Sequence, residues 1–155
     1  AGPTDQGVWL LMRALLMHGS ENKIKAEILY RDAVKLNPGL HRAANNLAML
    51  LSQRGTELDY ALELAESAVR EVPSNPNYYD TLAAVYGARG EQKEAESAIK
   101  VAIRLAPENA AWLLRQAEIR IAEKDSIGAR KILDQIESLN PKRSEQAQKL
   151  RDRLK

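Results

Sequence analysis

Four prolines recur along the chain at a nearly constant interval, and this periodicity constrains the fold more than any other feature. The positions of Pro38, Pro73, Pro107 and Pro141 differ successively by 35, 34 and 34. A fixed period of this size is typical of stacked helical hairpins. Because the proline ring cannot continue a helix and disfavours helical geometry in the preceding residue, each proline marks the end of one unit. The interval therefore predicts an all-α solenoid.

Small and aromatic residues recur at fixed distances before these prolines. The clearest copy consists of Tyr79, Leu82, Ala83, Tyr86, Gly90, Ala95, Ile99, Ala102 and Pro107. A second copy consists of Ala44, Leu47, Ala48, Leu51, Gly55, Ala61, Ala65, Ala68 and Pro73, and partial copies lie on either side. The pattern resembles the tetratricopeptide repeat, W-x2-L-G-x2-Y followed by A-x3-F and P. The resemblance covers roughly residues 7–141.

This resemblance implies a right-handed α-α superhelix of about four helical hairpins. The chain is then one domain, in which a helix over residues 142–155 caps the last hairpin, as terminal repeats must. The expected repeats span residues 7–40, 41–75, 76–109 and 110–141.

Alanines are expected where the two helices of a hairpin approach closely, because only a small side chain fits there. The predicted contacts join alanines of first helices to alanines of second helices: Ala48 with Ala61, Ala83 with Ala95, and Ala117 with Ala129. Gly55 and Gly90 are expected to end first helices in the left-handed conformation.

Composition and motifs give no support for catalysis. The absence of cysteine excludes disulfides and thiolate metal sites, although it does not fix the compartment. His18 and His41 have no serine or carboxylate at a catalytic spacing, and the chain has no phosphate loop, HExxH or EF-hand pattern. We therefore predict no enzyme, no catalytic residue, no metal and no cofactor. Carboxylates such as Glu63, Glu66, Glu94, Glu96 and Glu118 are interpreted as solvated helix positions.

Charge is concentrated at the C-terminal end. Residues 142–155 contain six basic and two acidic groups, so this end carries +4 and the rest of the chain carries −2. Basic residues complement a helix C-terminus, and no aromatic side chain interleaves with them to stack on bases. We therefore predict no nucleic-acid partner. The longest apolar stretch, residues 8–17, is too short to cross a bilayer, so membrane insertion is not predicted.

The resemblance implies that first helices line a concave groove. Amide side chains there can both donate to and accept from a peptide backbone, which favours binding of a protein or peptide segment. We thus predict a non-catalytic protein–protein interaction scaffold. The expected groove residues are Arg42, Asn45, Asn46, Met49, Gln53, Asn77, Asp80, Thr81, Ala84, Arg115 and Glu118.

Related repeats that hold a chaperone's C-terminal carboxylate use a clamp of Lys, Asn and Arg side chains. The matching positions here are Leu11, Leu15, Asn46, Asn77 and Thr81, of which only Asn46 fits. The clamp's basic residues are missing, so this partner is rejected. The stretches NNLAMLL and YYDTLAAVY are more similar to repeats of bacterial proteins for surface-polysaccharide or exported-protein assembly.

The first helix has apolar residues all round it, which indicates burial on more than one side. Its register is either Ala14 or Met12 at the close-packing position, depending on whether it is counted from Pro38 or from Gly19. Either way one apolar face is expected to mark an interface. Upstream repeats, a second copy of the chain or a groove ligand could cover it. The residues proposed for self-association are Val8, Trp9, Leu11, Met12 and Leu15.

These observations leave two alternatives to a peptide-binding scaffold. The chain could be a scaffold that assembles with itself through the first helix, giving a homo-oligomer. It could also be an auxiliary repeat domain of a larger enzyme.

Overall fold

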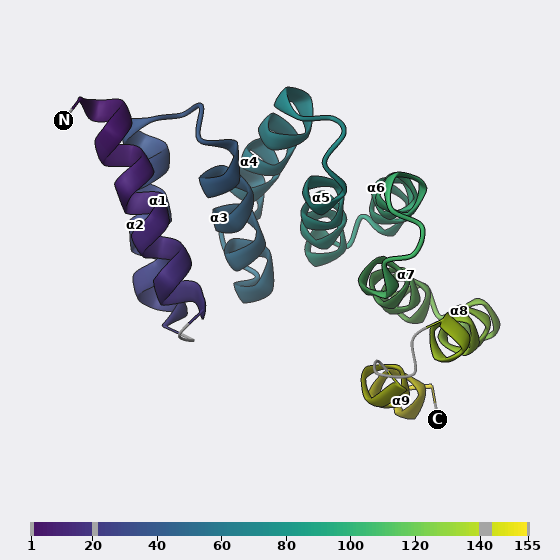
Figure 1. The fold of residues 1–155 in the computed structure, drawn as a ribbon. Coiled ribbons are helices and arrows are strands. Elements are labelled where there is room, and N and C mark those ends of the chain that lie inside the picture. The colour runs from purple at the N-terminus through teal and green to yellow at the C-terminus, as the bar shows by residue number, and fades with distance from the viewer. Residues whose placement is uncertain (1, 20–21, 140–143, 155) are drawn as a thin grey trace. The chain divides into compact units, whose positions relative to one another are not determined.

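The computed structural model describes residues 2–19, 22–139 and 144–154, and within these ranges all regular structure is helical (Figure 1). The helices are α1 (Pro3–Gly19), α2 (Lys23–Leu36), α3 (His41–Arg54), α4 (Leu58–Glu71), α5 (Pro76–Arg89), α6 (Gln92–Leu105), α7 (Ala110–Ala122), α8 (Ser126–Leu139) and α9 (Ser144–Asp152). The all-α prediction is therefore confirmed.

Consecutive helices pack as hairpins: α1 with α2, α3 with α4, α5 with α6, and α7 with α8. These four hairpins follow the proline interval of the sequence. The chain divides into two compact units, unit 1 (Ala1–Pro73) with the first two hairpins and unit 2 (Ser74–Lys155) with the last two and α9. The single domain expected from the sequence stays a prediction.

Alanines fill the interior of every hairpin that the repeat motif covers. The six predicted at close helix contacts are at most 1% exposed: Ala48, Ala61, Ala83, Ala95, Ala117 and Ala129. Larger residues occupy the space around them, and Leu47, Ile99, Leu133 and Ile136 are fully buried. This alternation of small and large side chains is what allows the two helices of a hairpin to approach closely.

Local sequence explains where the first helices begin and end. The side chains of Asn75 and Asn109 cap α5 and α7 by accepting hydrogen bonds from backbone N–H groups. Gly55 and Gly90 follow α3 and α5 with φ of 68° and 81°, the left-handed conformation that the sequence predicted. After α7, Lys124 adopts the same conformation, with φ of 61°.

Helix α9 covers one side of the last hairpin. Ala147 and Leu150 are 0% and 8% exposed and join a core cluster with Leu113, Leu133 and Ile136. The predicted cap is thus present over residues 144–152, while residues 140–143 and 155 lie outside the described part of the chain.

Candidate functional site

A groove runs along α7 within unit 2, between α5 and α9. It consists of two adjoining hollows of about 260 Å³ and 330 Å³, which share Arg115 and Glu118 as lining residues. The first hollow lies between α5 and α7 and reaches Arg153, and the second lies between α7 and α9. We call these two hollows together the unit 2 groove.

The α5 wall of the groove is formed by residues with little or no side chain. Ala84, Gly87 and Ala88 line it, and Ala122 lies on the α7 side. A methyl group built at Gly87 would meet no atom within 4 Å beyond its chain neighbours and the backbone of its own helix, so the space in front of this residue is open. A ligand's main chain can therefore approach the α5 backbone closely along this wall.

Arg115 lies at the centre of the groove and is held by two carboxylates. Its Nε donates to Asp80 Oδ1 at 2.9 Å, and its Nη1 donates to Glu118 Oε2 at 2.9 Å. Burial opposes the charge of Arg115, but the carboxylates of Asp80 and Glu118 outweigh it and raise the pKa of the guanidinium. The result is a permanently charged donor whose position is fixed from α5 and from its own helix.

The groove brings together four of the six side chains that sequence analysis predicted for it on α5 and α7. Ala84, Arg115 and Glu118 line it, and Asp80 holds Arg115 in place. Thr81, in contrast, is only 1% exposed, because α5 is buried on more than one side. Asn77 is exposed at the start of α5, where its side-chain amide donates to Asn75.

The predicted groove residues of unit 1 are divided between the surface and the interior. Arg42 and Gln53 are exposed, and Met49 is half-buried. Asn45 is only 7% exposed and donates to Asn46, whose own Nδ2 donates to the hydroxyl of Tyr30 at 3.2 Å. The Asn46 amide is therefore engaged in packing α3 against α2, and the Asn45 amide is buried beside it.

The same hydroxyl joins a third helix to this network. Tyr30, which is fully buried on α2, lies 3.2 Å from Nδ1 of His18 on α1. Burial, and secondly the charge of Lys23, lower the pKa of His18. In the neutral form, Nδ1 of His18 can accept a hydrogen bond from the Tyr30 hydroxyl while the hydroxyl oxygen accepts one from Asn46.

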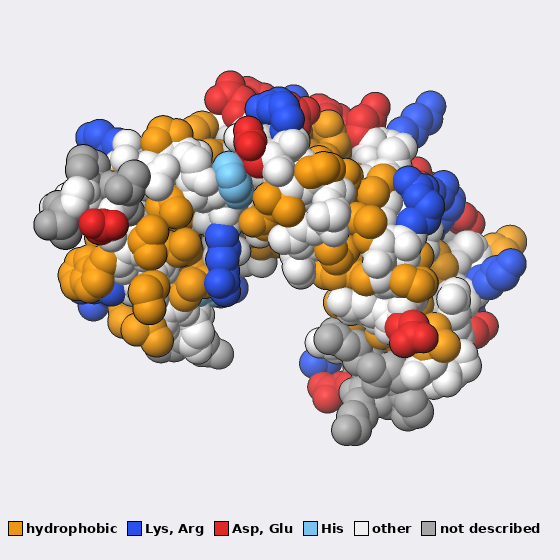
Figure 2. Space-filling model, turned by 45° about the horizontal axis from the view of Figure 1, so that its top comes forward, with side chains coloured by type: hydrophobic (Ala, Val, Ile, Leu, Met, Phe, Trp, Pro, Cys, Tyr) orange, Lys and Arg blue, Asp and Glu red, His pale blue; other side chains and the backbone are white. Residues whose placement is uncertain are grey.

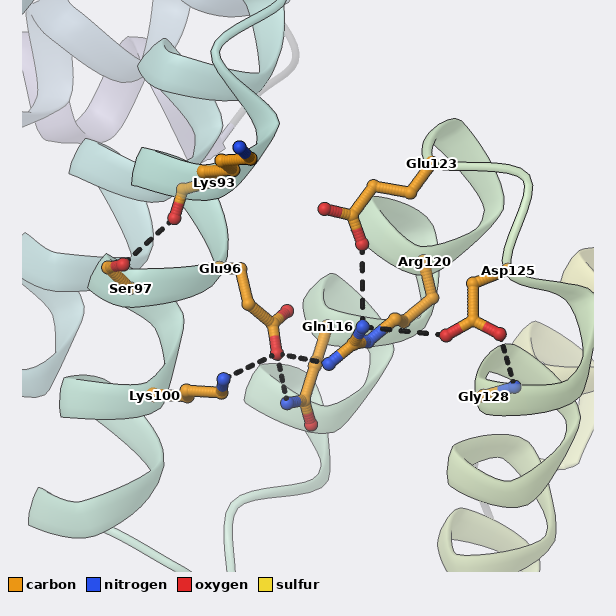
Figure 3. Close-up of polar contacts among 9 residues, drawn as sticks. All are labelled: Lys93, Glu96, Ser97, Lys100, Gln116, Arg120, Glu123, Asp125 and Gly128. Carbon is orange, nitrogen blue, oxygen red and sulfur yellow. Dashed lines mark hydrogen bonds and ion pairs between the residues drawn. The ribbon is translucent and has the colours of Figure 1, made fainter.

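Glu96 is the centre of a buried polar cluster between α6 and α7, shown in Figure 3. Its Oε1 accepts from Gln116 at 3.1 Å and from Arg120 at 2.8 Å, and the amine of Lys100 lies 3.3 Å away. With 7% of its surface exposed, Glu96 does not occupy a solvated helix position, so that interpretation is wrong. The missed signal is on α7, where Gln116 and Arg120 replace the apolar residues of the repeat motif.

A second buried glutamate occupies the equivalent place in unit 1. Glu27 lies two repeats before Glu96 in the sequence and is also 7% exposed. It pairs with Arg31 on α2 and with Arg54 on α3. Burial raises the pKa of Glu27, but the hydrogen bonds and charges of Arg54 and Arg31 outweigh this and lower it. Each of these carboxylates thus joins two successive hairpins.

An apolar hollow of about 360 Å³ lies between α5 and α6 at positions of the repeat motif. It is lined by Tyr79, Leu82 and Tyr86 together with Ala98 and Val101. These α5 residues are positions of the repeat motif, and the motif leucines of α3, Leu47 and Leu51, are fully buried. We therefore do not assign this hollow to a ligand.

The residues predicted for self-association face two directions on α1. Val8, Trp9 and Met12 are 44%, 57% and 61% exposed, whereas Leu11 is buried and Leu15 half-buried. Leu16, which the sequence analysis left out, is 69% exposed on the same side as Met12. Figure 2 shows hydrophobic side chains gathered over the N-terminal helices of unit 1.

The described residues contain no cluster of His, Asp or Glu arranged to hold a metal ion. None of the described helices has the length and apolar character needed to span a membrane.

Comparison with known proteins gives relatives in structure alone. No family model matches the chain, and no curated protein matches its sequence. A thermophilic TPR protein, TTC0263 of Thermus thermophilus, superposes with a TM-score of 0.80 at 22% identity, over 93% of this chain and 80% of the other. MamA of Desulfovibrio magneticus RS-1 gives 0.73 at 17% identity, over 86% and 75%. The first TPR of Spaghetti (RPAP3), bound to the HSP90 peptide SRMEEVD, gives 0.63 at 20% identity, over 73% and 89%.

Proposed function

We propose that this chain, which has the solenoid fold of tetratricopeptide-repeat proteins, is a non-catalytic interaction module that binds an extended peptide in the unit 2 groove. The observation that carries the proposal is the combination of an open wall of small residues on α5 with a fixed guanidinium, Arg115, at the centre of the groove. The first provides room for a main chain, and the second provides a directed hydrogen-bond donor.

The small wall favours an extended ligand over a bulky one. Ala84 and Ala88 lie one turn apart on α5, and Gly87 is next to Ala88 in the sequence. The open strip therefore follows the helix. A main chain lying along this strip offers a carbonyl oxygen or an N–H group at every residue. Backbone recognition of this kind gives affinity without strict dependence on the ligand's sequence.

The polar centre of the groove matches the needs of a peptide bond. Arg115 can donate to a ligand's carbonyl oxygen, and Glu118, whose side chain is 42% exposed, can accept from a ligand's N–H group. Because Asp80 and Glu118 already hold the guanidinium, little side-chain freedom is lost when the ligand binds. Fixed donors and acceptors therefore favour peptide binding here.

The opposite wall adds a charge preference. Lys149 and Arg153 on and after α9 line the groove and are exposed, whereas the Asp80–Arg115–Glu118 group carries a net charge of −1. An acidic side chain of the ligand would thus be attracted to the α9 wall. The TPR of Spaghetti is bound to the peptide SRMEEVD, so an acidic peptide is a ligand of one protein with this fold, although the clamp residues do not match here.

A test can exploit Gly87, because a side chain added there projects into open space. We expect Gly87→Leu to fill the groove and to weaken binding of a displayed peptide, selected on the intact chain, by about tenfold or more. Gly19→Leu is the matched control, since a Cβ at that helical glycine also meets nothing within 4 Å. Isothermal titration with the selected peptide measures both variants. Equal affinity for Gly87→Leu and the parent chain would exclude the unit 2 groove as the binding site.

A further inference from the structure

The outer side of α1 differs from the same side of later first helices. By the repeat spacing, Trp9 and Leu16 correspond to Ala43 and Leu50 on α3, which are 0% and 2% exposed. On α7 the corresponding residues are Trp112 and Ile119, at 6% and 4%. On α1 the values are 57% and 69%. These positions of the repeat are therefore buried in the later helices and open in α1.

The difference follows from the order of packing. Helix α3 packs against α2, and α7 packs against α6, so a preceding second helix covers these positions. Among the described residues no helix covers this side of α1. Four side chains at helical spacing form the uncovered stripe, which we call the outer face of α1: Val8, Trp9, Met12 and Leu16.

We propose that the outer face of α1 binds the same face of a second copy of this chain, in a two-fold symmetric dimer. The packing at the last hairpin favours a second copy of the chain as the partner. There, α9 already covers α7 and α8, with Ala147 and Leu150 in their core. The side of α9 that would meet α1 of another copy head to tail carries exposed polar residues, Glu145, Gln148 and Lys149, so this contact is disfavoured. Contact of the apolar face with the same face of a second copy gives a closed dimer instead of a filament.

The size of the face is sufficient for a specific contact. Its four side chains expose roughly 400 Å² of apolar surface, given that one aromatic side chain alone can bury 150–250 Å². Two such faces, together with their rims, bury about 1,200 Å² in total, which is the lower limit for stable interfaces. The area is thus sufficient for a stable dimer.

Charge favours an antiparallel arrangement of the two α1 helices. The acidic residue of the first turn of α1 is Asp5, while Lys23 and Lys25 open α2 beside the other end of α1. If the two-fold axis passes near Met12, Asp5 of each copy lies toward the lysines of the other. This arrangement forms the attraction twice, whereas a parallel arrangement would place like charges together. Arg13, which stacks on the Trp9 ring, lies near Met12 and therefore near the axis in both arrangements, so it does not distinguish them.

The first test measures mass by sedimentation velocity over a concentration series. We expect a dimer for the parent chain and a monomer for Trp9→Glu/Leu16→Glu, because each dimer would bury four carboxylates in the contact. Ile127→Glu/Leu139→Glu is the matched control: both residues are exposed on α8, at 85% and 55%, and their replacement should leave the dimer unchanged. A parent chain that is monomeric at about 100 µM, where interfaces of this size are occupied, overturns the proposal.

The second test reports the symmetry directly and does not depend on the first pair of variants. The chain contains no cysteine, so Met12→Cys introduces a single thiol. A residue near a two-fold axis faces its own copy, and we expect a rapid disulfide-linked dimer under mild oxidation. Ile127→Cys, which is also exposed, should link far more slowly. Equal rates for the two variants overturn the symmetric contact, whatever the outcome for the unit 2 groove.

Discussion

Replacing Arg120 alone in the cluster around Glu96 is expected to destabilise the chain, whereas replacing three residues of the cluster together is not. The variant Arg120→Ala removes the cation closest to Glu96, whose side chain is only 9% exposed. The partners that remain are Lys100, at 3.3 Å, and the neutral Gln116. Loss of one partner from a buried ion pair costs roughly 3–5 kcal/mol. Because Arg120 is itself 29% exposed and Lys100 remains, we expect about 2–3 kcal/mol here.

The opposite effect is expected when the whole cluster is made apolar. Gln116 and Arg120 on α7 correspond, one repeat earlier, to Leu82 and Tyr86 on α5. The triple variant Glu96→Leu/Gln116→Leu/Arg120→Tyr restores that pattern and removes every charge that would be left unpaired in the interior. Replacing a buried ion pair by packed apolar residues is neutral or stabilising by roughly 1–4 kcal/mol. We therefore expect the triple variant to be at least as stable as the parent.

Urea unfolding followed by circular dichroism at 222 nm gives the measurement, with the parent chain and Lys149→Ala as references. Lys149 pairs with Glu145 on the exposed side of α9, so its replacement should leave the unfolding midpoint unchanged. If Arg120→Ala unfolds at the parent's midpoint, Glu96 is not held by a buried ion pair. A triple variant that is less stable than the parent would show that the polar cluster itself stabilises unit 2, contrary to this expectation.

Three further predictions concern stability. Ala83→Leu should overpack the α5–α6 hairpin and destabilise the chain by roughly 1–3 kcal/mol, whereas Ala88→Leu, at an exposed position of the same helix, should change the melting temperature little. Lys124→Gly should stabilise the chain by about 0.5–1 kcal/mol in thermal unfolding, because its φ of 61° strains any side chain; a lower melting temperature would contradict this. The lowered pKa of His18 means that the unfolded state binds more protons, so its contribution to stability is complete above about pH 6.5 and is lost as the pH falls through the folded-state value. Melting temperatures at pH 7.5 and 5.5 should therefore differ more for the parent than for His18→Ala. Equal differences would show that the contact of His18 with Tyr30 makes no pH-dependent contribution to stability.

The fold could be predicted from the sequence because the residues that determine it are local and repeated. The prolines end each unit, the alanines lie at the closest approach of two helices, and Gly55 and Gly90 reverse the chain. Each of these roles depends on the shape of a single residue, which a repeated pattern reveals. The positions of the four hairpins therefore followed from spacing alone.

Side-chain partners were harder to predict, because they depend on contacts between repeats. Asn46 looks like a groove residue in sequence, and only the position of Tyr30 on α2 shows that its amide is already bound. Leu11 and Leu16 look alike on an all-round apolar helix, and only the packing of α1 on α2 decides which is buried. Glu96 could have been recognised, since Gln116 and Arg120 interrupt the apolar motif at the two positions that face it.

The two buried glutamates also limit how this chain could be shortened or extended. Glu27 pairs with Arg54 in the next hairpin, and Glu96 pairs with Arg120 in the next hairpin, while the equivalent position after Ala61 holds Leu62. Removing only the hairpin that follows either glutamate would take away the guanidinium of Arg54 or Arg120 and leave the carboxylate with the cation of its own helix, Arg31 or Lys100. Removing both hairpins of one unit, a step of two repeats, takes the glutamate and its arginine away together. A shortened or extended chain is therefore expected to keep each of these glutamates together with the hairpin that follows it.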